Sequence, residues 1–240
     1  MPYALCDSRI SENCRAALLR EGFEVIALPP AKGLSEPIAS HTDMLLFSHA
    51  DTLITTKNYR ASCREIFDKL EICSSGTEFI YTDEDFSPEY PSDAILNALC
   101  IGNKIFLRAE SCSRSILGYA QKRGLEIIPV KQGYPACVAL GLNESAITSD
   151  EGLACAMRAT GVRVTLIKNS ESIHLPPYGY GFIGGAAGVK GDKVYFLGDL
   201  NSHPDSEIIK QAIASEGLIP CSLDTTADDL ADLGGIRFLG

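Results

Sequence analysis

The chain ends in LGGIRFLG, residues 233–240, and the interpretation of the whole sequence depends on this segment. Two glycines lead into branched, basic and aromatic side chains, and only one of the eight residues is charged. Chain ends that do not pack against the rest of a protein are usually polar. We therefore expect residues 233–240 to form a paired strand, and the fold follows from which strand they pair with.

The sequence returns several times to one pattern, a helical stretch that ends at a glycine and leads into an apolar strand. Clear copies cover residues 11–28, 111–130, 149–167 and 202–223, with Gly22, Gly124, Gly161 and Gly217 at the predicted helix ends. Ser11 is expected to cap the first helix. A weaker copy, residues 59–82, carries an insertion before Gly76.

Two short apolar runs precede every helix except the first. They cover residues 44–47 and 52–56, 95–102 and 104–108, 137–142 and 145–148, and 184–189 and 193–198. Each unit is therefore predicted to be strand, strand, helix, strand. The first unit starts at residues 3–7 and lacks its opening strand.

The terminal segment is one strand more than the last unit needs, and we expect it to fill this vacancy. The ring would then close and leave no exposed sheet edge. The predicted fold class is α/β, a five-unit α/β propeller of ββαβ repeats with pseudo-five-fold symmetry around a central channel. It forms a single domain over residues 1–240, with units of approximately 1–40, 41–92, 93–131, 132–180 and 181–240. An open α/β sheet of two Rossmann-like halves is the alternative.

Composition limits the classes of function. Apolar residues make up 45% of the chain, and no run approaches the roughly 20 residues of a membrane span. The start lacks the features of a signal peptide, so a cytoplasmic protein without membrane contact is expected. The net charge of −10 argues against a nucleic-acid partner and is compatible with a cationic ligand, although acidity also serves solubility.

The nine cysteines are scattered, form no C-x-x-C pair and are not matched by histidines at metal-ligand spacing. Most lie in apolar runs, where a reduced cysteine behaves as a small hydrophobic residue. We expect a reducing compartment, no metal and no cofactor.

Five such units and a Gly-Gly-x-Arg-x terminal strand resemble the pentein fold of the guanidino-group modifying enzymes. More closely, KQGYPAC, TSDEG, GYGFIGGAAGV and FLGDLNSHP are similar to segments of an uncharacterised bacterial family assigned to that fold. The resemblance covers most of the chain and is strongest from residue 131 on. It implies a channel that takes a guanidine-like small molecule.

The resemblance also implies where catalytic residues should stand. Deiminases have a cysteine nucleophile after Gly-Gly-x-Arg, where this chain has Phe238. Their His-Leu-Asp is matched only by His174-Leu-Pro, and their Glu-Gly-Gly-Asp only by Gln132-Gly-Tyr-Pro. These three departures indicate that the standard cysteine and histidine chemistry is absent.

The segment GYGFIG, residues 179–184, fits the dinucleotide fingerprint G-x-G-x-x-G, but no helix is predicted after it. We favour a strand that passes close to other backbone, with or without a ligand. The residues predicted to line the channel are Gln132, Tyr134, Asp150, Tyr180, Phe182, Asp199, Asp232, Arg237 and Phe238.

Several candidates have a plainer structural interpretation. Asp7, Glu110, Asp150 and Asp199 stand where strands lead into helices, where a carboxylate caps a helix. Cys137, taken to begin an inner strand, is a weak candidate for a substitute nucleophile and otherwise a core thiol. His174 is a weak candidate at the channel rim. We expect His203 to be a surface or capping residue.

The predicted function is a pentein-fold protein whose channel holds a small polar or cationic ligand without standard deiminase or amidinotransferase chemistry. One alternative is a hydrolase or transferase that acts on guanidino or amidino C–N bonds with non-standard residues. The other is a non-catalytic pentein that binds a protein or the ribosome, like initiation factor six, which the acidic charge disfavours. The oligomeric state is left open.

Overall fold

The computed structural model describes residues 2–168 and 171–240. Within these residues, all strands except two form five three-stranded sheets of one design, in which an antiparallel pair is followed by a parallel pair. The sheets are β17 (Arg237–Leu239), β1 (Tyr3–Asp7) and β2 (Glu24–Leu28); β3 (Phe47–His49), β4 (Thr52–Thr56) and β5 (Glu78–Thr82); β6 (Leu99–Ile101), β7 (Lys104–Leu107) and β8 (Glu126–Pro129); β9 (Ala139–Gly141), β10 (Ser145–Thr148) and β11 (Arg163–Leu166); and β13 (Ala187–Lys190), β14 (Lys193–Phe196) and β15 (Ile219–Ser222). This architecture is incompatible with one open Rossmann-like sheet.

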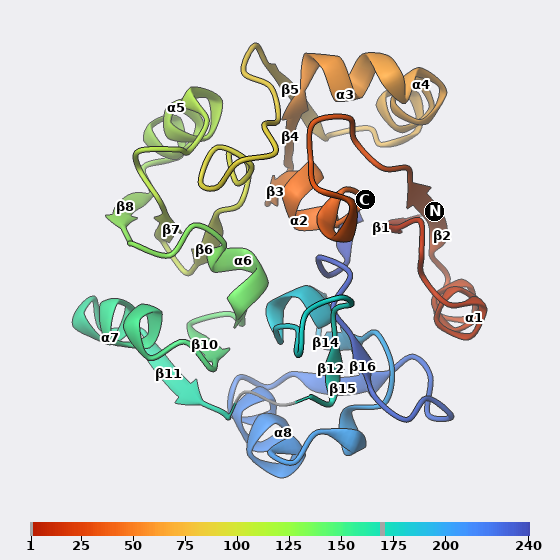
Figure 1. Cartoon of the computed structure of the whole chain (residues 1–240), viewed down its shortest axis with the longest axis vertical. Helices are drawn as coiled ribbons and strands as arrows, with labels where there is room; N and C mark the ends of the chain where they lie inside the picture. Colours follow the sequence, from red (N-terminus) through yellow and green to blue (C-terminus); the bar gives the residue numbers. More distant parts are fainter. Residues whose placement is uncertain (1, 169–170) are drawn as a thin grey trace.

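In each of these five sheets, the two parallel strands are connected by one or two helices that lie at the periphery of the molecule (Figure 1). These helices are α1 (Glu12–Arg20), α3 (Lys57–Ser62) with α4 (Arg64–Cys73), α5 (Arg114–Arg123), α7 (Glu151–Ala159) and α8 (Ser206–Ser215). The helix ends agree with the sequence pattern, since Ser11 Oγ accepts from the Cys14 N–H at 3.1 Å and the glycines that follow the helices have positive φ. The insertion in the weak repeat is a break between α3 and α4 at Cys63.

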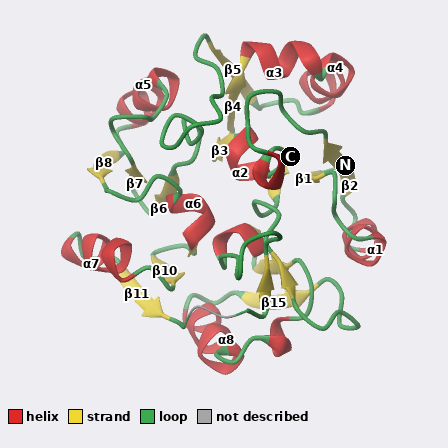
Figure 2. Cartoon of the chain, in the orientation of Figure 1, coloured by secondary structure: helices red, strands yellow, loops and turns green. Residues whose placement is uncertain are grey.

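Short helical turns lead into three of the inner strands: α2 (Thr42–Leu45), α6 (Pro135–Val138) and the 3-10 turn η2 (Gly184–Ala186). Figure 2 shows α2 and α6 nearer the centre than the peripheral helices. The prediction that Cys137 begins a strand is therefore wrong, because α6 starts at Pro135 and the strand starts at Ala139. Proline fits the first turn of a helix, where its missing N–H costs nothing.

The last strand lies in the first sheet. Tyr3 pairs with Leu239 and Leu5 with Arg237 in an antiparallel ladder, which is the pairing expected for the terminal segment. The hydrogen-bonded ladders of residues 2–168 and 171–240 stay within separate sheets, so no single sheet closes on itself. The sequence also did not predict the parallel two-stranded sheet of β12 (Ile173–His174) and β16 (Leu230–Ala231).

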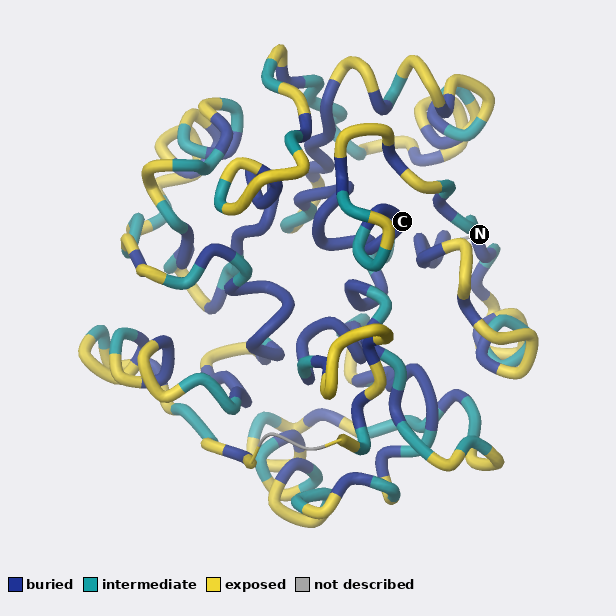
Figure 3. Tube along the Cα trace, viewed as in Figure 1, coloured by how far each residue is buried: buried dark blue, intermediate teal, exposed yellow. Residues whose placement is uncertain are grey.

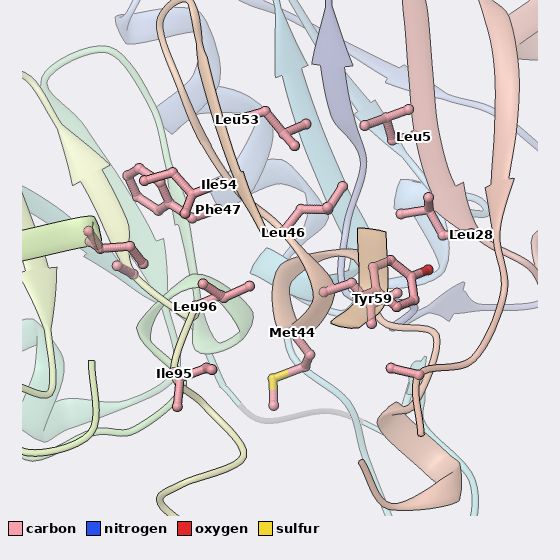
Figure 4. Close-up of a cluster of buried hydrophobic side chains, with 14 of the residues drawn as sticks. Leu5, Leu28, Met44, Leu46, Phe47, Leu53, Ile54, Tyr59, Ile95 and Leu96 are labelled. Atoms are coloured by element: carbon pink, nitrogen blue, oxygen red, sulfur yellow. The ribbon is translucent and has the colours of Figure 1, made fainter. Parts of the chain in front are cut away.

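The core is divided into several apolar clusters between the sheets and helices, and the inner segments of the chain are buried (Figure 3). The first cluster includes Met44, Leu46 and Phe47 (Figure 4), and Met44 has no exposed surface. Met44 and Leu45 thus fix α2 in the core, and the polar residues beside them are held in place. Among the described residues, no helix is both long and apolar enough to cross a membrane.

Candidate functional site

Four polar side chains from distant parts of the chain converge below a cavity. His41 and Asp43 lie at the start of α2, Cys137 lies in α6, and Asp232 immediately precedes the turn into β17. The potential ligand atoms of His41, Asp43 and Cys137 all lie within 4.8 Å of one another. His41 is fully buried, and Asp43, Asp232 and Cys137 are 1%, 1% and 7% exposed.

The Cys137 thiol is hydrogen-bonded on two sides. Its Sγ donates to Asp43 Oδ2 at 2.6 Å and accepts from Asn97 Nδ2 at 3.5 Å. Asn97 in turn accepts from the Ala136 backbone N–H at 2.8 Å. The asparagine, which lies just before β6, therefore fixes both the turn that carries the thiol and the thiol itself.

Asp232 is held by backbone groups. Its Oδ2 accepts from the Phe182 N–H at 2.9 Å and its Oδ1 from the Gly234 N–H at 3.2 Å. The same Oδ1 lies 3.8 Å from His41 Nδ1, which is an electrostatic contact but not a hydrogen bond. The Asp232 carboxylate therefore faces the His41 imidazole but does not form a hydrogen bond with its Nδ1.

Glycines make this crowding possible. A Cβ at Gly185 would lie 1.8 Å from Asp232 Oδ1, and one at Gly184 would lie 2.4 Å from the Ala136 carbonyl oxygen. Gly234 has a φ of +72°, and a Cβ at this position would lie 2.6 Å from His41 Cβ and 2.7 Å from Asp43 Oδ1. The GYGFIGG segment runs into the three-residue η2, which begins at Gly184, and not into an α-helix, so a dinucleotide site is not supported. The prediction of a strand over residues 179–184 is wrong, because the strand starts only at Ala187. The predicted close approach to other backbone is found at Gly184.

Burial dominates the titration of these groups. It lowers the pKa of His41, and it raises the pKa of Asp232 from its ordinary value of 3.8 to about 7, with the neighbouring Asp43 acting in the same direction. Burial, together with Asp43 and Asp232, raises the pKa of the Cys137 thiol well above its ordinary range. The pKa directions of His41 and Cys137 favour a neutral imidazole and a protonated thiol at neutral pH.

The cavity above these groups, which we call the acidic cavity, has a volume of about 620 Å³. Its polar and aromatic lining consists of Ser35, His41, Tyr90, Asp93, Tyr134, Cys137, Tyr178, Tyr180, Phe182 and Asp232. Asp93 accepts from the Tyr134 hydroxyl at 2.6 Å, and the Tyr180 and Phe182 rings pack edge to face. Within the described part of the chain, no lysine or arginine lines this cavity.

Comparison with known proteins places the chain in a family. The family model described as "Family of unknown function (DUF6873)" matches residues 5–237. The chain belongs to the DUF6873 family. No curated protein matches its sequence.

Several solved structures are similar to this DUF6873 chain over most of its length. They include dimethylarginine dimethylaminohydrolase from Pseudomonas aeruginosa in complex with citrulline (10% identity, TM-score 0.55, 95% of each chain covered) and C. jejuni agmatine deiminase (9%, 0.55, 92% and 87%). An amidinotransferase from Microseira wollei is also similar (13%, 0.50, 91% and 80%). These are pentein-superfamily proteins, so the resemblance indicated by the sequence motifs is confirmed for the fold. At such low identity it shows the fold alone.

The structure distributes the predicted channel residues of the DUF6873 chain over separate places. Tyr134, Tyr180, Phe182 and Asp232 line the acidic cavity, as does Cys137. Gln132 and Asp150 line a different cavity of about 660 Å³, and Arg237 and Phe238 line a third of about 330 Å³ bordered by inner strands.

The acidic residues at strand ends have structural contacts. Asp150 caps α7 by accepting from the Leu153 N–H at 2.7 Å, and Asp199 caps the 3-10 turn η3 (Leu200–Ser202) through the Asn201 N–H at 3.0 Å. Asp7 pairs with Arg9 at 2.7 Å. The interpretation of Asp150 and Asp199 as caps is thus confirmed, and neither carboxylate lines the acidic cavity.

The two histidines considered from the sequence lie outside the acidic cavity lining. His174 is 61% exposed at its side chain and its Nε2 lies 2.6 Å from Asp229. His203 is buried, so the surface prediction is wrong. Its Nδ1 accepts from the Asp205 N–H, but Asp205 is the N-cap residue of α8 and, among the described residues, this helix has no side-chain cap hydrogen bond, so the capping prediction is not confirmed.

The sequence interpretation missed His41, Asp43, Asp93 and Asn97. The available signal was weak: His41-Thr-Asp43 directly precedes an apolar run that packs in the core. Polar side chains next to a buried apolar segment are themselves held away from solvent. A histidine and an aspartate in that position therefore mark an internal polar site.

Proposed function

We propose that the acidic cavity binds a small organic cation of the guanidinium or amidinium class, and that Cys137 reacts with its central carbon. The observation that supports this most strongly is the lining of the cavity. Two carboxylates, four tyrosines and a phenylalanine surround a thiol, and the described lining contains no lysine or arginine. Such a surface is complementary to a planar cation and repels an anion.

The carboxylates and aromatic rings would share the recognition. Asp93 and Asp232 can accept the paired N–H donors of a guanidinium, an arrangement that is shorter and stronger than neutral hydrogen bonding. Tyr178 and Tyr180 are half exposed at the cavity, where a cation can lie over a ring face. The net charge of −10 attracts such a ligand.

The reaction follows from the positions of His41, Asp43 and Cys137. A bound cation favours the thiolate, and the thiol proton moves to Asp43 or His41. The sulfur then forms a C–S bond to the amidinium carbon, and the C–N bond to the leaving amine breaks as the amine takes the proton. Water attacks the resulting thiouronium carbon, which releases a urea-type product and a proton and restores the thiol.

The fold supports this proposal. The neighbours named above act on arginine derivatives or agmatine, or transfer amidino groups, as their names state. We further propose that the five similar sheets correspond to the five units of a pentein propeller around one centre. In this arrangement the thiol comes from the fourth unit, while the position expected from deiminases is occupied by Phe238.

A non-catalytic binding protein is the second candidate, and Phe238 is the observation that favours it. Phe238 packs against Phe23 at a ring-centroid distance of 4.8 Å, so it belongs to an apolar cluster. In this case the cavity still binds the cation, but Cys137 does not turn it over.

Thermal-shift and turnover assays separate these outcomes. Chelator-treated protein is screened with arginine, agmatine and methylarginines, and we expect at least one to raise Tm. The Asp93→Asn variant should lose this shift, whereas Asp150→Asn, a cap outside the cavity, should keep it. Cys137→Ser should keep the shift and lose amine release. No shift across the panel contradicts the proposal, and a shift without amine release from wild type favours the binding protein.

A further inference from the structure

His41, Asp43 and Cys137 have the composition and spacing of a metal-ligand set. Each provides one donor atom, and the three atoms lie within 4.8 Å of one another. A nitrogen, an oxygen and a sulfur donor together suit zinc and similar borderline divalent ions. All three side chains are at least nine-tenths buried.

Unsatisfied polar atoms are the independent observation. Within residues 2–168 and 171–240, neither ring nitrogen of His41 has a hydrogen-bond partner, and neither does Asp43 Oδ1. Buried polar atoms without a partner are costly and rare in folded proteins. Three of the buried atoms without partners therefore belong to two of the three candidate ligands, where a metal would use them.

The charge of the surroundings agrees with a cation. Asp43 and Asp232 face the same histidine, and Asp232 Oδ1 lies 3.8 Å from its Nδ1. A carboxylate beside a metal-bound imidazole is a common outer contact that orients the ring. Arg9, whose charge acts on both His41 and Asp232, is bound to Asp7.

We infer that His41, Asp43 and Cys137 bind one divalent metal ion of the zinc type, with Asp232 orienting the imidazole. The ion displaces the thiol proton, so binding forms a metal–thiolate bond and releases H⁺ to solvent. Asp43 Oδ2, which accepts the thiol proton in the described structure, then becomes available to the metal. Three protein ligands leave one coordination position for water or a small ligand.

Cobalt(II) provides the direct test because a thiolate ligand gives it a near-ultraviolet charge-transfer band. Chelator-treated protein titrated with Co²⁺ should develop this band and visible ligand-field bands, saturate at one equivalent and release a proton. The Cys137→Ser variant should lose the charge-transfer band. His41→Ala and Asp43→Asn should bind at least about tenfold more weakly.

The matched control is Cys63→Ser, which removes another buried thiol, between α3 and α4. It should keep the full cobalt spectrum. Folding of every variant is checked by circular dichroism, and Asp43→Asn keeps the side-chain shape if Cys137→Ser does not fold. Absence of the charge-transfer band in wild type, or its persistence at full strength in Asp43→Asn and His41→Ala, overturns the inference.

The metal site does not depend on the proposed reaction, and the two fail separately. A cobalt spectrum without any thermal shift from guanidines supports the metal and contradicts the cation pocket. A thermal shift from guanidines in metal-free protein, without a cobalt spectrum, supports the cation pocket and contradicts the metal site. If both hold, Co²⁺ should also slow alkylation of Cys137 by iodoacetamide, because the sulfur is then coordinated.

Discussion

The Cys137 thiol acts as a hydrogen-bond donor to Asp43. Its proton lies toward Asp43, and burial and two neighbouring carboxylates raise the pKa of the thiol. A thiol in this environment is inert until a positive charge arrives. The two cation proposals share this physical basis, since an organic cation and a metal ion both favour the thiolate.

Asp232 predicts a pH dependence of stability. Its pKa of about 7 in the folded chain exceeds its ordinary value of 3.8, so the folded state holds an extra proton between about pH 4 and 7. The free energy of unfolding therefore falls as pH rises through this window, relative to Asp232→Asn. Three pKa units correspond to about 4 kcal/mol. Urea unfolding of both proteins from pH 4 to 8 measures this, and parallel profiles would contradict it.

At the residue scale, the sequence could identify Cys137 and Asp232 but could not group them with His41 and Asp43. Cys137 and Asp43 are 94 positions apart. Metal and catalytic motifs are recognised by short spacing, and here only His41 and Asp43 are close in sequence. The expectation that the chain has no metal site rested on that spacing, which carries no information about contacts between distant turns.

At the scale of elements, glycines allow the turns of the site to approach one another. η2 carries Gly184 and Gly185 directly beside the backbone of α6 and the side chain of Asp232. A side chain at either position would push the turns apart. Glycine loses more conformational entropy on folding than any other residue. At these two positions, the close contact between the turns requires glycine despite this cost.

We expect Gly185→Ala to destabilise the protein by more than about 3 kcal/mol, because its Cβ would lie 1.8 Å from Asp232 Oδ1. The same change should weaken both cobalt and guanidine binding. Gly118 in α5 is the matched control, since it is exposed and a Cβ there meets no atom within 4 Å. Gly118→Ala should stabilise the helix by about 1 kcal/mol. Equal urea midpoints for the two variants would contradict the prediction.

The sequence predicted regular elements well and turns poorly. Helix ends at Gly22 and Gly217 and the cap at Ser11 follow from local chemistry, which a sequence displays directly. Apolar runs such as residues 137–142 read as strands, yet the first residues of this run form a helical turn. A short buried run has no polar face to reveal its period, so only tertiary contacts decide its conformation.

At the scale of the whole molecule, the first and last segments form one sheet. β1 has β17 on one side and β2 on the other, and Thr42 Oγ1 donates to the Gly235 carbonyl at 3.1 Å. The sequence indicated this pairing because the terminal segment is apolar and the first unit lacks a strand. It did not indicate β12 and β16, whose two-residue ladders are too short to leave a pattern.

Hydrogen exchange measures how firmly the terminal strand is held. We expect the amides of β17 to be protected to the same extent as those of β1, because both strands share one antiparallel ladder. The Tyr3 and Leu5 region and peptides covering residues 236–240 should therefore exchange on the same timescale in native-state mass spectrometry. Fast exchange confined to residues 236–240 would show that the segment frays.

The equivalence of α2 and α6 has a consequence for divergence. Thr55 Oγ1 donates to the Leu45 carbonyl and Thr148 Oγ1 to the Val138 carbonyl, each across ten positions, so the two turns occupy matching places in their sheets. Side chains carried by equivalent turns of different sheets can thus reach the same interior point, as Asp43 of α2 and Cys137 of α6 do. A functional group lost from one copy can be regained in another without moving in space, and ancestry is then better traced by location than by aligned residues.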